Sequence, residues 1–271
     1  MSVASHHDVR VEFLAKLRYA QSRVLLLDYD GTLAPFTPDR ERAFPYPEIP
    51  ELVSRILRAG TRVVLISGRP ATELLYLSGV HPPPEIWGSH GAERLLPDGS
   101  YQVDPPLQAH QLALRATAQS LHACGFSSQM EIKPGGIAVH WRGLPPEQRE
   151  PIEAKVRTLF ASAAKEHGLV VLPFDGGLEV RASGKNKGDA VSAVLAEAGS
   201  GVAAAYLGDD HTDENAFRAI KGRGIAILVR PEPRPTTADI WLRPPEELSR
   251  FFRDWLKACG AENETAGRPS D

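Results

Sequence analysis

An α/β fold with a parallel sheet and an inserted α+β domain is predicted by three features of the sequence. Short apolar runs alternate with helical stretches in the first part of the chain, the alternation returns in the last part, and the middle part differs in pattern. Strands that alternate with helices favour a parallel sheet, and nearly continuous apolar strands indicate burial on both faces. Both ends of the chain are therefore expected to form one Rossmann-like sheet.

The expected elements of this sheet are short and end in polar turns. The strands are residues 24–27, 61–66, 202–207 and 225–229, and the helices are residues 47–59 and 187–197. The helices have apolar residues at the spacing of one helical face, whereas the strands are unbroken apolar runs. We assign residues 1–107 and 182–271 to this core.

The middle part, residues 108–181, is predicted to be a separate domain. The expected helices are residues 108–124 and 146–167, and the expected hairpin strands are residues 129–133 with 137–142 and residues 170–172 with 177–181. The first hairpin turns at Pro134-Gly135-Gly136, a sequence typical of turns. The order αββαββ predicts an α+β domain inserted into the core.

Composition and charge exclude several classes of protein. Hydrophobic residues make up 42% of the 271 residues and charged residues 24%, which fits a globular chain and not a disordered or fibrous one. The net charge of −3 provides no basic field for nucleic acid or a membrane surface. Two cysteines cannot form a disulfide framework, and no apolar run reaches the roughly 18 residues that cross a bilayer, so we expect a cytoplasmic protein.

The strongest local signal is Asp28-Tyr29-Asp30-Gly31-Thr32, directly after an expected strand. Ligands of open α/β sheets gather outside the carboxyl ends of the strands, so both carboxylates reach one site if the chain turns at Gly31. Like charges this close are costly unless a cation lies between them or one is protonated, and Mg²⁺ prefers oxygen ligands. The simpler alternative is an acidic turn that closes a strand.

A second acidic motif, Gly208-Asp209-Asp210-His211-Thr212-Asp213-Glu214, follows the expected strand 202–207. Four acids within six residues suit a cation, because hard oxygen ligands offset the dehydration of Mg²⁺. A solvated acidic loop is the alternative.

Two further segments carry groups that suit a phosphate. Ser67-Gly68-Arg69 follows the expected strand 61–66, and Lys187 opens the expected helix 187–197. A hydroxyl, a guanidinium and an ammonium group at such places can bind phosphate oxygens. Each signal is weak by itself, because a capping serine or a solvated lysine accounts for it.

These four segments, in this order, resemble the motifs of the haloacid dehalogenase superfamily of aspartyl-phosphate phosphatases. DYDGT matches the first motif, and Ser67, Lys187 and GDDHTD fall where the second, third and fourth are expected. The resemblance implies that Asp28 attacks phosphorus to form an aspartyl phosphate, and that Asp30 protonates the leaving oxygen and then activates water.

The same resemblance implies the groups around the reacting atoms. Ser67 and Lys187 would bind the phosphoryl oxygens. Mg²⁺ would be held by Asp28, the carbonyl of Asp30 and Asp209, with Asp210 and Asp213 fixing the metal waters or the lysine.

Further motifs are similar to those of the trehalose-6-phosphate phosphatase family. They are DYDGTLAP at 28–35, GSHGAE at 88–93, Glu131-x-Lys133, His140-x-Arg142, Gly177-x-Glu179-x-Arg181, Asn186-Lys187-Gly188 and YLGDDHTDENAF at 206–217. The resemblance runs from about Leu25 to Val229 and implies a cap domain that binds the sugar. The sugar-binding residues would be Glu131, Lys133, His140, Arg142 and Glu179, with Asn186 and Arg69 nearer the phosphate.

The spacing of the cap residues is compatible with this role. Glu131 and Lys133 have the same parity on one expected strand, as do His140 and Arg142 on the next, so each pair shares a face. Carboxylate, ammonium and guanidinium groups together can distinguish sugar hydroxyls where water is excluded. The alternative is a salt-bridge patch on an exposed sheet face.

We therefore predict a Mg²⁺-dependent phosphatase that hydrolyses trehalose 6-phosphate through an aspartyl phosphate. The alternatives are a phosphatase of glucosyl- or mannosyl-phosphoglycerate or sucrose phosphate, and a non-catalytic sugar-phosphate sensor. The presence of both Asp28 and Asp30 argues against a sensor, because binding alone needs neither a nucleophile nor an acid. We expect a monomer whose coupling to a synthase, as in relatives that carry both domains, involves a separate chain.

Overall fold

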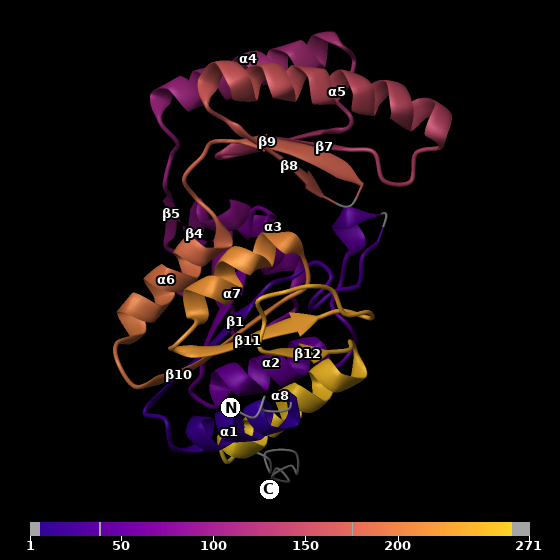
Figure 1. Ribbon diagram of the computed structural model, residues 1–271. Helices are drawn as coiled ribbons and strands as arrows, with labels where there is room; N and C mark the ends of the chain where they lie inside the picture. The colour runs from indigo at the N-terminus through magenta and orange to yellow at the C-terminus, as the bar shows by residue number, and fades with distance from the viewer. Residues whose placement is uncertain (1–5, 38, 175, 262–271) are drawn as a thin grey trace, which may run out of the picture. The chain divides into compact units, whose positions relative to one another are not determined.

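The computed structural model describes residues 6–37, 39–174 and 176–261 (Figure 1). The chain divides into two compact units, one made of residues within Met1–Gln102 and Asn186–Asp271 and the other of Val103–Lys185. No helix in the described ranges is both long and apolar enough to cross a membrane.

One mixed sheet organises the first unit. Its strands are Ser22–Leu27 (β1), Arg62–Ile66 (β2), Glu85–Gly88 (β3), Glu93–Leu95 (β4), Tyr101–Val103 (β5), Val202–Gly208 (β10), Gly224–Val229 (β11) and Ile240–Leu242 (β12). They lie in the order β12-β11-β10-β1-β2-β3-β4-β5. The pairs from β12 to β3 are parallel, and β3 pairs antiparallel with β4. The predicted parallel sheet is confirmed for the strands from β12 to β3.

Helices cover both faces of this sheet because its strands are apolar on both faces. Leu25 and Leu27 of β1 pack into the same cluster as the helices His6–Tyr19 (α1), Ile49–Arg58 (α2), Ala71–Leu77 (α3) and Glu246–Ala258 (α8). Val24 and Leu26, which point to the other face, pack with Lys187–Ala198 (α6) and Glu214–Ile220 (α7). The sheet is therefore a buried layer, and its polar chemistry is confined to the strand ends.

The register of the central strands brings three chain segments to one edge. Leu27 of β1 is in register with Leu207 of β10 on one side and with Leu65 of β2 on the other. Each strand ends at its leucine or one residue beyond it, so the chain leaves the sheet at nearly the same level in all three places. The Asp28, Ser67 and Asp209 segments are thereby brought together from distant parts of the sequence.

The second unit has a four-stranded antiparallel sheet in the order β6-β7-β9-β8, built from Met130–Lys133, Gly136–His140, Gly177–Arg181 and Val170–Phe174 respectively. Two helices, Gln108–Ala123 (α4) and Pro146–His167 (α5), pack on one face through a cluster that includes Val156, Phe160 and Val180. The predicted αββαββ order is observed. One detail differs: β7 ends at His140, so Arg142 lies in the following turn and not on the strand.

Candidate active site

The nucleophile motif begins where β1 leaves the sheet. The Asp28 N–H donates to the carbonyl of Leu207 at 2.9 Å, so the aspartate is fixed by the last rung of the β1-β10 ladder. Gly31 then turns the chain with φ of +81°. A Cβ atom at this position would lie 2.3 Å from Oδ2 of Asp209, so the turn needs glycine both for its backbone conformation and for the close approach of Asp209.

Lys187 joins the two acidic motifs. It is the first residue of α6, and its Nζ donates to Oδ1 of Asp28 at 2.6 Å and to Oδ1 of Asp213 at 2.7 Å. The lysine side chain is 4% exposed. Burial opposes its charge, but the two carboxylates outweigh that effect and raise the pKa of Lys187. The ammonium group is therefore held charged beside Asp28.

Asp213 is saturated with hydrogen bonds. Its Oδ1 accepts from Lys187 and from the Tyr206 hydroxyl at 2.5 Å, and its Oδ2 accepts the N–H groups of Asp209 and Asp210 at 3.1 and 2.9 Å. Both Asp213 oxygens therefore accept hydrogen bonds that fix the Asp209–Asp210 backbone and orient the Lys187 side chain. This geometry favours Asp213 as a supporting carboxylate over a metal ligand.

Asp209 is bonded differently. Its side chain is almost fully buried, yet its carboxylate accepts no hydrogen bond from any residue in the described ranges. Burial and the charges of Asp28 and Asp213 raise its pKa well above the ordinary value. A buried carboxylate without donors is unfavourable, and a bound cation would relieve it.

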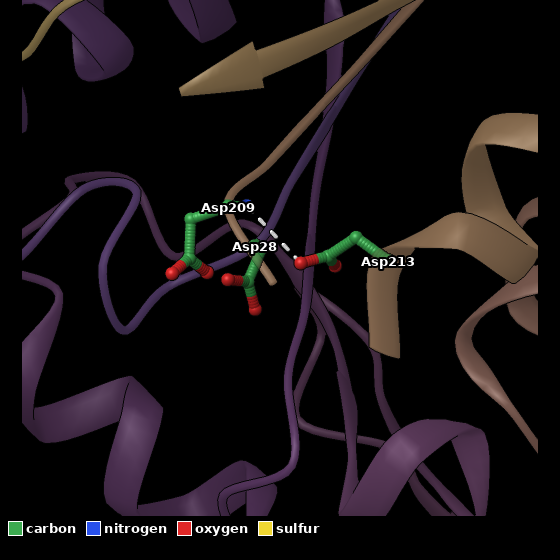
Figure 2. A group of neighbouring side chains, drawn as sticks. All are labelled: Asp28, Asp209 and Asp213. Atoms are coloured by element: carbon green, nitrogen blue, oxygen red, sulfur yellow. Dashed lines mark hydrogen bonds between the residues drawn. The ribbon is translucent and has the colours of Figure 1, made fainter. Parts of the chain in front are cut away.

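Three carboxylates, from Asp28, Asp209 and Asp213, each offer an oxygen within 4.8 Å of the others (Figure 2). Burial and the charge of Asp213 raise the pKa of Asp28 to about 7, against the opposing effect of Lys187. The carboxylates of Asp28 and Asp209 are hard oxygen donors that fit a divalent cation such as Mg²⁺, with Asp213 as the supporting carboxylate. The carbonyl of Asp30, the third predicted ligand, also accepts no hydrogen bond from the described part of the chain.

Arg69 contacts Asp30 directly. Its Nε and Nη2 each donate to one Asp30 oxygen at 2.7 Å, while Nη1 donates to Glu73 and, at 3.0 Å, to the carbonyl of Arg40. Burial opposes the charge of the guanidinium, and the carboxylates of Asp30 and Glu73 raise its pKa. In this structure Arg69 therefore orients the predicted acid, a contact that the prediction of a phosphate-side role did not include.

Ser67 lies at the carboxyl end of β2, beside β1, and is 2% exposed. Its carbonyl accepts the N–H of His90 at 2.8 Å, and His90 has a φ of 58°. The GSHGAE motif thus forms a turn packed against Ser67-Gly68-Arg69. Ser89 and Ala71 both donate to Glu93 and fix this turn.

Four of the predicted sugar-binding residues share one face of the second unit's sheet. Glu131 pairs with Ala138 of β7, which in turn pairs with Glu179, while Ile137 and Val139 face the helices. Nε2 of His140 lies 2.8 Å from Glu131, and Nζ of Lys133 lies 3.1 Å from Glu179. The face is polar and internally paired.

The remaining two predicted binding residues are Arg142 and Asn186. Arg142 packs against Gly176. A Cβ atom added to this glycine would lie 2.5 Å from the Cβ atom of Arg142. Asn186 caps α6: its Oδ1 accepts from Gly188 at 2.8 Å and its Nδ2 donates to Asp189 at 2.7 Å. Their binding roles stay predictions.

Several residues at the site were not singled out by the sequence. Tyr206 ends a run of small apolar residues, and its hydroxyl contact with Asp213 has no periodic signal. Thr32 belongs to the DYDGT motif, and its hydroxyl donates to Asp28 at 3.2 Å. Arg230 and Arg234 approach the backbone of the second acidic motif from beyond β11.

An aspartate pair, a buried lysine and an acidic loop at the carboxyl ends of adjacent parallel strands define a phosphatase core of the haloacid dehalogenase type. Comparison with known proteins gives the particular group. The model of the family described as Trehalose-phosphatase matches residues 26–244. The chain belongs to the trehalose-phosphatase family.

Named relatives agree with this membership. Trehalose 6-phosphate phosphatase RA3 of Zea mays is 30% identical over 285 residues, covering 94% of this chain and 76% of its own length. Trehalose-phosphate phosphatase of Mycobacterium avium (strain 104) is 32% identical over 248 residues, covering 84% of this chain and 60% of its own. The chain thus spans about three quarters of the plant relative and three fifths of the mycobacterial one.

Solved structures show the same fold. The C-terminal domain of C. albicans trehalose-6-phosphate phosphatase has a TM-score of 0.71 at 21% identity, covering 93% of this chain and 96% of that one. The phosphatase BT1666 of Bacteroides thetaiotaomicron, from the haloalkanoate superfamily, has a TM-score of 0.58 at 19% identity, covering 89% and 96%. Likeness at this level of identity concerns the fold.

Proposed function

We propose that this chain hydrolyses trehalose 6-phosphate to trehalose and phosphate, with Mg²⁺ as its metal and a phosphoryl group carried transiently by Asp28. The family membership supports the substrate. The observation that carries the mechanism is the juxtaposition of Asp28, buried Lys187 and the donor-free carboxylate of Asp209. A nucleophile, a fixed positive charge and hard oxygens that suit a divalent cation are the groups that transfer of an anionic phosphoryl group requires.

In the first step a carboxylate oxygen of Asp28 attacks phosphorus as the bond to the sugar oxygen breaks. The Thr32 hydroxyl and Lys187 hold the two Asp28 oxygens, which orients the nucleophile. Asp30 donates a proton to the leaving sugar oxygen. The products of this step are trehalose and an aspartyl phosphate.

In the second step water attacks the phosphorus of the aspartyl phosphate. Asp30, now a carboxylate, accepts a proton from that water, and the bond to Asp28 breaks to release inorganic phosphate. Arg69, which contacts both Asp30 oxygens in this structure, stabilises the carboxylate form that this step begins with.

Anionic oxygens of the phosphoryl group need charge and hydrogen bonds throughout. Lys187 supplies a buried positive charge and Ser67 a hydroxyl at the adjacent strand end. Asp28, the Asp30 carbonyl and Asp209 would hold Mg²⁺, which would reduce the repulsion between the nucleophile and the phosphate. Asp213 and Asp210 fix the lysine and the loop.

The sugar would be recognised by Glu131, Lys133, His140, Arg142 and Glu179, with Asn186 and Arg69 toward the phosphate. The polar sheet face formed by the first of these supports the proposal, because paired carboxylate and cationic groups can exchange partners for sugar hydroxyls. We further propose that the chain acts as a cytoplasmic monomer on substrate made by a separate synthase chain.

A phosphate-release assay over a panel of sugar phosphates, with and without Mg²⁺, tests the proposal. We expect turnover of trehalose 6-phosphate that requires the metal and is lost in Asp28→Asn. Preferred turnover of sucrose phosphate or of glucosyl- or mannosyl-phosphoglycerate would assign a different substrate. Binding of trehalose 6-phosphate without phosphate release would instead show a sensor.

A further inference from the structure

Two arginines hold the backbone carbonyls of the Asp209–Asp210 loop. Arg234 donates from Nε to the carbonyl of Asp209 at 3.2 Å and from Nη2 to the carbonyl of Asp210 at 2.6 Å. Arg230 donates to the same Asp209 carbonyl at 3.1 Å. The Arg234 side chain is only 10% exposed, so these bonds are largely shielded from water.

Glu214 holds Arg234 in turn. Its Oε1 accepts from Nη1 of Arg234 at 2.6 Å and from the Thr236 hydroxyl at 2.8 Å. Its Oε2 accepts from the N–H and the hydroxyl of Thr237 at 2.9 and 2.7 Å. Burial opposes the charge of this carboxylate, but the bonds from Thr237, Thr236 and Arg234 lower the pKa of Glu214 to about 2. The anchor is therefore ionised at neutral pH.

The segment that carries Arg234 is stiff. Prolines at 231, 233 and 235 flank the arginine between β11 and β12. Each proline fixes its own φ near −65° and restricts the residue before it. Little backbone freedom is therefore left for Arg234 to lose when it forms its hydrogen bonds.

The loop is thereby fixed through both kinds of backbone group. The N–H groups of Asp209 and Asp210 donate to Asp213, and their carbonyls accept from Arg234 and Arg230. The main chain held in this way sets the direction in which the Asp209 side chain leaves the backbone, and its carboxylate lies beside that of Asp28 (Figure 2). The positive charge of Arg234 is balanced by Glu214, so its effect is on geometry more than on net charge.

We propose that Arg234, anchored by Glu214, is a positioning residue that holds the Asp209 carboxylate where a divalent cation binds. This inference rests on the proposed function, in which Asp209 is a metal ligand. A ligand whose direction is fixed before binding pays less entropy on binding, so loss of Arg234 weakens metal affinity without removing any ligand atom.

The test is calorimetric titration of the full chain with Mg²⁺ in the absence of substrate. We expect Arg234→Gln and Glu214→Gln each to weaken Mg²⁺ binding about 10- to 100-fold, as is typical when partners of metal ligands are removed. Arg218→Gln is the matched control, because Arg218 is an exposed arginine of the same unit whose side chain donates to Asn215. It should bind Mg²⁺ as the unmodified chain does.

Activity measured against Mg²⁺ concentration separates positioning from general loss of structure. A positioning defect is overcome by raising Mg²⁺, so kcat of Arg234→Gln should return toward the original value. The double variant Arg234→Gln, Glu214→Gln should be no weaker than the worse single variant, since Glu214 acts through Arg234.

The outcomes distinguish this inference from the function on which it rests. If the unmodified chain binds no Mg²⁺, the proposed metal role fails. If the unmodified chain binds Mg²⁺ and both single variants bind it as tightly, the positioning role alone is overturned. The same conclusion follows if the effects of the two substitutions on Mg²⁺ affinity add in the double variant. Should Arg234→Gln not fold, Arg230→Gln, which removes one donor to Asp209, decides by the same titration.

Discussion

The ammonium group of Lys187 lies 2.6 Å from Oδ1 of Asp28, although 159 positions separate the two residues in the chain. Both are buried, and the only other described carboxylate bonded to the lysine is that of Asp213. The contact joins the first strand of the core to the helix that follows the inserted unit. A charge pair formed this way depends on the whole core being assembled.

Substitution of Lys187 should therefore affect both fold and catalysis. We expect Lys187→Gln to lower kcat by about 100-fold or more, because a fixed charge at the phosphoryl oxygens is lost. It should also lower the melting temperature, since Asp28 and Asp213 lose their buried partner. Lys185→Gln is the control: it is two residues away, exposed and paired with exposed Asp104, and should change neither quantity. An unaltered kcat in Lys187→Gln would contradict the role.

The raised pKa of Asp28 predicts how stability depends on pH. Burial and Asp213 raise this pKa from 3.8 to about 7, so the folded state holds the proton more tightly than the unfolded chain does. The contribution to stability is complete below about pH 4 and is lost as the pH rises through 7. In metal-free protein, Asp28→Asn should therefore become more stable relative to the original chain as the pH rises from about 4 to about 7. The difference in melting temperature between the two proteins measures this gain.

Asp98 provides a control for that experiment, because its pKa is shifted in the opposite direction to that of Asp28. It is exposed, and the Ser100 N–H lowers its pKa, so its contribution is present at neutral pH and lost on acidification. Asp98→Asn should therefore become slightly less stable than the original chain as the pH rises. A melting-temperature difference for Asp28→Asn that does not change with pH would contradict the assignment.

Gly31 is predicted to be needed for more than its backbone conformation. Gly31→Ala meets a φ of +81° and would place a methyl group against Asp209, whereas Gly60→Ala meets a φ of +82° with no atom within 4 Å. Both should lose about 1 kcal/mol of stability from the left-handed conformation. Only Gly31→Ala should also lose phosphatase activity and Mg²⁺ affinity, because Asp209 is displaced. Equal activity in the two variants would show that the contact is unimportant.

The sequence predicts the parts of this molecule that depend on strand ends. Apolar runs that stop at Asp28, Ser67 and Asp209 specify three strands, and a parallel sheet brings such ends to one edge without any knowledge of side-chain contacts. The short strands β3, β4 and β5 and the helix α8 were not assigned. Strands of three or four residues are too brief to show a period.

Contacts between side chains from different elements were harder to predict. Arg69 is predicted to lie toward the phosphate, and the sequence gives no sign that Asp30 and Glu73 also lie within its reach and compensate its buried charge. Arg142 was expected on a strand, but β7 ends at His140, and Gly143, with φ of +80°, turns the chain after Arg142. The rest of the helix α7 and the strand β11 lie between Glu214 and Arg234 in the chain, so no local sequence pattern predicts this pair.

The polar sheet face of the second unit allows a test of substrate recognition. Lys133 is bonded to Glu179, and both side chains are less than 10% exposed, so each loses a partner if the other is removed. If these groups bind the sugar, Lys133→Gln and Arg142→Gln should lower kcat/KM for trehalose 6-phosphate about 10- to 100-fold, the value of one or two charged hydrogen bonds. A small aryl phosphate, which has no sugar, should be hydrolysed with nearly unchanged kcat/KM.

Arg157→Gln, which breaks an exposed pair with Glu153 on α5, should affect neither substrate. Equal losses for both substrates, together with a lower melting temperature, would show that the face is a structural salt-bridge patch.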